Sequence, residues 1–168
     1  MGFAEERQMA ELAFDYDGTG QAADYPPVSN RIRAARERLG LSDDEVVRRW
    51  GVEPSFYWDL EIANDEIFTC IDIAKLPDLA RVLETPLPVL LFGSESPVPL
   101  LRTSAAVLAR RVTELIESEG ISANELSDKV GWELGPLLAD PETLGTFNIA
   151  GLRDVCKAVG VDWLGVIA

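Results

Sequence analysis

One short stretch, residues 39–61, limits the fold of this 168-residue chain more than any other part of it. Gly40 fits the left-handed backbone position that ends many helices. Ser42 and Glu45 follow at the spacing of a capping box, in which the two side chains satisfy free amides at the start of a helix. Gly51 then suits the end of that helix. The stretch therefore predicts a short helix of about two turns, fixed at both ends by its own sequence.

Helices are also predicted on both sides of this element. Upstream, apolar residues recur at helical spacing from Val28 to Leu39, which gives one buried stripe. Downstream, Pro54 suits the first turn of a helix reaching about residue 62, with Tyr57 and Leu60 facing the core. Three further elements are expected here: a packed loop at 67–71, a helix from its cap Asp72 to about residue 84, and a short helix at 86–93. Pro77 implies that the second of these either starts late or bends.

The order of these caps and helices resembles the Cro/repressor-like (XRE-type) helix-turn-helix family over residues 28–93. The most specific matches are Leu39-Gly40-Leu41-Ser42-x-x-Glu45-Val46, then Gly51-Val52 and Leu60-Glu61. A fainter copy lies eighty residues on, where Gly120, Ser122, Glu125 and Gly131 repeat Gly40, Ser42, Glu45 and Gly51.

The resemblance implies an all-α fold with two tandem five-helix repressor-like units behind an acidic arm. In the second unit, Gly135 and Pro136 argue against a helix at the position of the third helix. The expected divisions are an acidic N-terminal arm at 1–27, a helix-turn-helix domain at 28–93, a linker at 94–103, and a degenerate second domain at 104–168.

Composition excludes several classes of function. A net charge of −14, from 29 acidic and 15 basic residues, opposes nucleic-acid binding and favours either solubility or a basic partner. The chain has no histidine, which removes the commonest general base and metal ligand. We expect no enzyme activity, no cofactor, no metal, no small-molecule substrate and no membrane span, and a cytoplasmic location. Cys70 and Cys156 fit either a disulfide or two buried thiols, and a reducing cytoplasm favours the thiols.

The third helix of each predicted unit carries the wrong chemistry for reading DNA bases. In repressor-like domains the start of this helix enters the major groove, where bases are read by Arg, Lys, Asn, Gln, Ser or Thr. Here the first unit offers Glu53, Pro54, Ser55, Phe56 and Asp59, of which only Ser55 is a usual reader. The corresponding residues of the second unit are Glu133, Leu134, Gly135, Pro136, Leu137 and Asp140.

The first hypothesis for the surface of the first unit concerns the aromatic residues of its third helix. Phe56, Tyr57 and Trp58 are consecutive and cannot all face one core, because a helix turns about 100° per residue. With Tyr57 facing the core, Phe56 and Trp58 either pack at the core edge or against the arm, or they anchor a protein interface in an acidic setting. The candidate partner-binding residues are Phe56, Trp58, Asp59, Glu61, Asp65 and Glu66.

Arginines on the first two predicted helices support a second hypothesis, in which the first unit contacts the phosphate backbone of DNA. Such helices normally contact the phosphate backbone. The candidate phosphate contacts are Arg31, Arg33, Arg36, Arg48 and Arg49, and the alternative is a solvated face paired with local acids. A third hypothesis places Asp15, Asp17 and Asp24 of the arm over these arginines in place of phosphate.

The arm contains one further motif, Phe14-Asp15-Tyr16-Asp17-Gly18-Thr19, which resembles the nucleophile loop of haloacid-dehalogenase-type phosphatases. That chemistry needs a buried parallel strand before the loop and an α/β domain after it, and the sequence predicts neither. An acidic turn is the preferred interpretation.

The charge and the third helices together favour a non-catalytic protein that acts by protein–protein binding, such as an antitoxin, an immunity-type inhibitor or a regulator of a basic protein. The alternative is a DNA-binding transcriptional regulator.

Overall fold

The computed structural model describes residues 26–94, 99 and 101–167 of the chain. This described part consists of helices and turns without a β-strand, so the predicted all-α class is confirmed. None of its helices has the length and the apolar character that crossing a membrane requires. The predicted arm, with Asp15, Asp17 and Asp24, lies outside the described residues.

The described residues form two compact units. The first contains residues 26–67 and 77–94, and the second contains Phe68–Leu76 together with residues 99 and 101–167. Residues 68–76, which the sequence places inside the predicted domain 28–93, therefore pack in the second unit. The boundaries of the two tandem domains stay a prediction.

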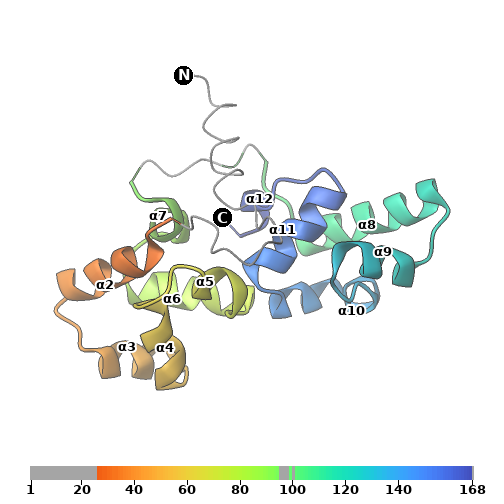
Figure 1. Ribbon diagram of the computed structural model, residues 1–168. Helices are drawn as coiled ribbons and strands as arrows, with labels where there is room; N and C mark the ends of the chain where they lie inside the picture. The colour runs from red at the N-terminus through yellow and green to blue at the C-terminus, as the bar shows by residue number, and fades with distance from the viewer. Residues whose placement is uncertain (1–25, 95–98, 100, 168) are drawn as a thin grey trace. The chain divides into compact units, whose positions relative to one another are not determined.

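The helices of the first unit follow the predicted order (Figure 1). Helices α2, α3 and α4 come first, α3 packs against α4, and α2 packs against both α4 and α7. Their bounds are α2 Val28–Arg38, α3 Asp43–Trp50, α4 Pro54–Leu60 and α7 Leu87–Phe92, while α6 spans Leu76–Val82 and enters this unit at Pro77.

The predicted end signals of α3 are confirmed in detail. The Ser42 hydroxyl accepts the Glu45 amide at 3.2 Å, and the Glu45 carboxylate accepts the Ser42 amide at 3.0 Å. Gly51 ends the helix in the left-handed conformation, with φ of 76°. Tyr57 and Leu60 of α4 are fully buried, as predicted.

Two local predictions in residues 66–84 are wrong. The expected loop at 67–71 contains one turn of helix, α5 (Glu66–Thr69), because Ile67 and Phe68 both find buried positions. Asp72 makes no side-chain cap; a 3₁₀ helix, η1 (Ile73–Lys75), follows it instead. Helix α6 begins only at Leu76, which puts Pro77 in its first turn, where a proline is tolerated.

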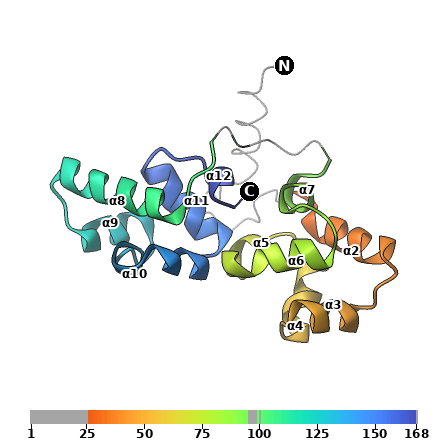
Figure 2. The ribbon, with the colours of Figure 1, turned by 180° about the vertical axis from the view of Figure 1, so that it is seen from behind.

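The second unit has its own helical core, seen from behind in Figure 2. Helix α10 packs against α8, α9 and η2, and α11 packs against α9. The segment from the middle of the chain closes this core, since the Ile73 amide donates to the Phe147 carbonyl at 2.7 Å. The elements are α8 Ala105–Glu119, α9 Ala123–Val130, α10 Gly135–Ala139, η2 Pro141–Thr146, α11 Ile149–Ala158 and α12 Leu164–Ile167.

Helix α10 contradicts the expectation drawn from Gly135 and Pro136. These residues occupy its first turn, where proline loses no intrahelical hydrogen bond. The two cysteines also differ from the preferred interpretation of two buried thiols. They are not joined in a disulfide; Cys156 is buried, which raises its pKa to about 12, whereas Cys70 is exposed.

Candidate functional site

A cluster of charged and polar side chains connects α2 with α4 and the residue that follows it in the first unit. Glu61, just after α4, is only 8% exposed. Arg36 donates two hydrogen bonds to its carboxylate, at 2.6 Å and 2.9 Å, in the paired geometry that makes arginine–carboxylate contacts strong. The Tyr57 hydroxyl donates a third at 2.5 Å, and Arg33 donates to the same carboxylate at 3.4 Å. We call Arg33, Arg36, Tyr57 and Glu61 the Glu61 cluster.

The ionisation of this cluster follows from its contacts. Burial disfavours the charged form of Glu61, but the hydrogen bonds from Arg36, Tyr57 and Arg33 outweigh burial and lower its pKa. The hydrogen bond to Glu61 raises the pKa of Arg36, and burial, helped by the same carboxylate, raises the pKa of Tyr57. The cluster is therefore an ion pair with a neutral tyrosine at neutral pH.

The Glu61 cluster corrects two of the predicted sets of site residues. Glu61 belongs to the candidate partner-binding residues, but its buried carboxylate is fully engaged within its own unit. Arg36 belongs to the candidate phosphate contacts, but only 14% of its side chain is exposed, and it also bonds Asp43 and the Leu41 carbonyl. Neither residue presents its charge to an external ligand.

The other predicted phosphate contacts differ in how far their side chains are engaged within the first unit. Arg31 donates to the Leu91 carbonyl at 2.6 Å and to the Leu90 carbonyl at 3.3 Å, and burial lowers its pKa. Arg33 is 45% exposed and donates to the Glu61 backbone carbonyl as well. Arg48 and Arg49 are 72% and 49% exposed and lie 4.0 Å and 3.8 Å from Glu45 of their own helix. Of these four arginines, only Arg48 and Arg49 are exposed and held by no more than a long ion pair within their own helix.

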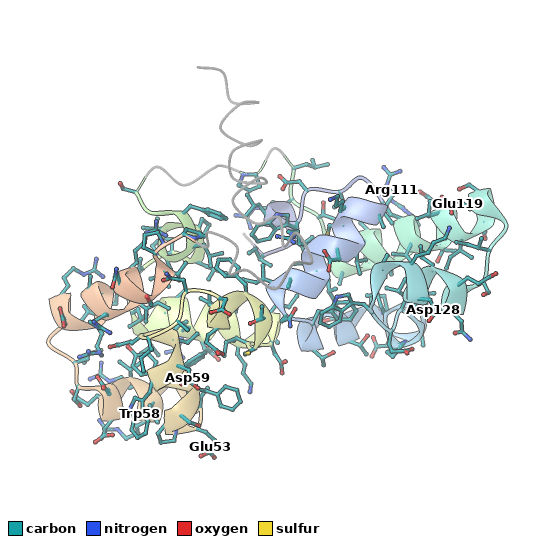
Figure 3. All side chains as sticks on the ribbon, viewed as in Figure 1. Glu53, Trp58, Asp59, Arg111, Glu119 and Asp128 are labelled. Atoms are coloured by element: carbon teal, nitrogen blue, oxygen red, sulfur yellow. The ribbon has the colours of Figure 1, made fainter. Side chains whose placement is uncertain are left out.

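The outward side of α4 is the most distinctive surface of the first unit. Trp58 is 48% exposed and Ile62, in the turn after the helix, is 75% exposed. Together with exposed Pro54 they follow positions i, i+4 and i+8, which form one stripe along a helix. Exposed Glu53 and Asp59 adjoin the stripe (Figure 3). We call Glu53, Pro54, Trp58, Asp59 and Ile62 the α4 surface.

Within the described residues, the carboxylates of the α4 surface differ from Glu61 in having no cation as a partner. No arginine or lysine of the described residues lies within salt-bridge distance of Glu53 or Asp59. Phe56, another predicted contact residue, is 44% exposed and lies one helical turn from Asp59. The surface therefore joins apolar area to uncompensated negative charge.

The remaining predicted contacts lie outside this surface, and three of its exposed residues, Glu53, Pro54 and Ile62, were not among the predicted contacts. Asp65 is exposed in the turn before α5, and Glu66 is half-buried in the first turn of that helix. Ile62 was predicted as the last residue of a helix, whereas α4 ends at Leu60 and Ile62 lies in the turn after it. Its i+4 spacing from Trp58 was the signal that could have found it.

The corresponding part of the second unit is built differently. Leu134 and Leu137 are buried, and the Ser127 hydroxyl accepts the Leu134 amide at 3.0 Å. Trp132 stacks on Phe147, with ring centroids 5.3 Å apart. The second unit thus uses its local aromatic residues internally, where the first exposes Trp58.

No group of three or more side chains suited to binding a metal ion occurs in the part of the chain that the structure describes. Comparison with known proteins gives no further guide to function: the chain matches no family model, no curated protein and no solved structure.

Proposed function

We propose that this protein is a non-catalytic, acidic helix-turn-helix protein that acts by binding another protein through the α4 surface. The setting we favour is a cytoplasmic antitoxin, immunity-type inhibitor or regulator whose target carries a basic surface. The observation that carries the proposal is the exposed stripe of Pro54, Trp58 and Ile62 beside the carboxylates of Glu53 and Asp59, which form no ion pair with any of the described residues.

The tandem helix-turn-helix arrangement is part of this proposal. Its support is the local agreement between two segments eighty residues apart: α3 runs from Asp43 to Trp50, and α9 from Ala123 to Val130. Each helix starts with a complete capping box and ends at a left-handed glycine, Gly51 or Gly131. A duplicated unit is the simplest source of this agreement.

The chemistry of the α4 surface supports a protein partner. Tryptophan is enriched among the residues that dominate binding energy, especially when apolar neighbours exclude water around it. Glu53 and Asp59, which pair with no cation of the described part of the chain, gain most from a partner that supplies positive charge. The net charge of −14 would add long-range attraction for such a partner.

DNA binding is the second candidate, and Arg48 and Arg49 favour it because both side chains are exposed. Against it, Arg31 and Arg36 are engaged within the first unit. Glu53 and Asp59 at the outward side of α4 would also meet the phosphates. A DNA-binding protein should lose affinity steeply as salt rises, so the salt dependence of any binding separates the two candidates.

The test is affinity capture of the partner with the full-length protein, followed by calorimetry with the purified partner. The double variant Trp58→Ser/Ile62→Ser should bind at least about thirtyfold more weakly, as expected for loss of an interface hot spot. Leu101→Ser is the matched control, since Leu101 is 72% exposed but lies in the second unit. Unchanged binding by the double variant, or nanomolar binding to a DNA operator instead of a protein, would overturn the proposal.

A further inference from the structure

We infer that the α4 surface recognises an arginine side chain of its partner, held between the indole of Trp58 and the carboxylate of Asp59. This inference rests on the proposed function and names the chemical group that the surface selects. It is carried by the position of Trp58, Asp59 and Ile62 and by the charge left uncompensated there.

The three side chains border one patch of the helix surface. Trp58 and Asp59 are consecutive and diverge by about 100° around the axis. Ile62 follows them at i+4 and i+3, so it lies beside both. The backbone supports this continuation past α4, because the Ile62 amide donates to the Asp59 carbonyl at 3.1 Å. An incoming side chain at this patch can therefore contact the carboxylate, the indole and the isoleucine together.

The Glu61 cluster is an internal example of the arginine–carboxylate half of this recognition, although Tyr57 contributes its hydroxyl and not its ring face. There a carboxylate, an aromatic side chain and an arginine meet, and Arg36 bridges both carboxylate oxygens. At the α4 surface the carboxylate of Asp59 and the aromatic ring of Trp58 are present, but no described cation pairs with the carboxylate. The missing group is the arginine, and charge complementarity assigns it to the partner.

Arginine fits this patch better than lysine does. A guanidinium is planar, so it can stack on an indole while its edge donates two hydrogen bonds to a carboxylate. An ammonium is a compact, strongly hydrated charge that cannot do both with the same geometry. The hydrocarbon stem of the arginine would lie against Ile62, whose side chain is 75% exposed.

The experiment uses the full-length protein and two small probes, N-acetyl-arginine methyl ester and N-acetyl-lysine methyl ester, followed by NMR. The Trp58 indole N–H, assigned with a Trp58→Phe variant, should shift with both probes. The arginine probe should bind about two- to fivefold more tightly. Asp59→Asn should remove this preference, whereas Asp140→Asn, which changes an exposed aspartate of the second unit, should preserve it.

The outcomes separate this inference from the proposed function. Equal affinity for the two probes, or shifts confined to other residues, would overturn arginine recognition. The proposed function would still stand if capture of the partner depended on Trp58 and Ile62. A second copy of the chain is the competing occupant of the patch, and sedimentation equilibrium tests it. Concentration-dependent dimers that Trp58→Ser converts to monomers would assign the patch to a second copy and overturn the inference.

Discussion

The two segments around α3–α4 and α9–α10 share their local helix signals but stabilise their surroundings by different chemistry. The shared signals are the capping boxes at Ser42 and Ser122 and the glycines that end α3 and α9. The Glu61 cluster, in contrast, has no counterpart in the second unit. Eighty residues after Arg33, Arg36, Tyr57 and Glu61 stand Thr113, Ile116, Leu137 and Pro141, none of them charged.

This difference shows that helix ends and helix packing are specified separately. The first unit ties α2 to the end of α4 by an ion pair and keeps Trp58 on its surface. The second unit packs Trp132 against Phe147 and against Gly151 of α11. A buried ion pair and an apolar contact of similar size can support similar folds. Removing only one member of the ion pair is far more destabilising, because it leaves the other charge buried without a partner.

The largest effect is expected for Glu61→Ala. It leaves the mostly buried Arg36 without its main partner and the Tyr57 hydroxyl without an acceptor. The free energy of unfolding should fall by about 3–5 kcal/mol, the usual effect of removing one member of a buried ion pair. Chemical denaturation measures the change, and hydrogen exchange should locate it in α2 and α4. Glu53→Ala, at an exposed glutamate before the first residue of α4, is the control. A similar small change in both variants would contradict the structural role of Glu61.

Acidification should weaken the first unit relative to the second. The pKa of Glu61 is lowered in the folded state, so its stabilisation is present above the unfolded glutamate pKa, about 4.3, and is lost as the pH falls through the folded value. In the second unit, burial raises the pKa of Asp154, so protonation below that value favours its folded state. Glu45 and Glu125 both have pKa values lowered by the capping-box bonds, so they affect the two units alike.

Hydrogen exchange at pH 6 and pH 3.5 measures this contrast. Protection should fall more in α2 and α4 than in α9 and α11, and Glu61→Gln should remove most of the difference. The effect should be smaller than that of Glu61→Ala, because a protonated carboxyl keeps its size and part of its hydrogen bonding. Equal loss of protection in both units would contradict the assignment.

A smaller effect is expected at the aromatic contact of the second unit. A Cβ added at Gly151 would lie 2.1 Å from the Trp132 ring, so Gly151→Ala must displace the indole from Phe147. The expected loss of stability is about 1–3 kcal/mol, as for other overpacked cores. Near-ultraviolet circular dichroism should report the moved indole. Gly135→Ala is the matched control, since nothing lies within 4 Å of its added Cβ, and it should be neutral.

Sequence patterns predicted the elements that short-range rules determine. The capping boxes, the helix-ending glycines and the core positions Tyr57 and Leu60 depend on residues within one or two turns of each other, so they were found correctly. Part of the α4 surface was found in the same way, because three consecutive aromatic residues cannot all be buried. Helix α10 was missed because proline was weighed as a helix breaker and not as a first-turn residue.

Long-range partners could not be predicted from these patterns. Arg36 and Glu61 are twenty-five residues apart, and their carboxylate pairing depends on how α2 meets α4. The same limit applies to Thr69, whose carbonyl accepts from the Asn148 side chain and so helps to place residues 68–76 in the second unit. An arginine-rich helix therefore indicated phosphate contacts in the sequence, whereas Arg31 and Arg36 serve the fold.

The smallest effects, and the sharpest test of the shared signals, are expected for the paired variants Ser42→Ala and Ser122→Ala. Each serine accepts the amide three residues on at 3.2 Å, in the same capping box at the start of an eight-residue helix. Each variant should therefore lower the free energy of unfolding by about 1 kcal/mol, with the loss of amide protection confined to α3 or α9. Ser55→Ala, at an exposed serine within α4, should change little. Independent local signals should lower the free energy of unfolding by the same amount in both variants. A difference of more than about 0.5 kcal/mol would show that the packing around each helix changes the contribution of its cap.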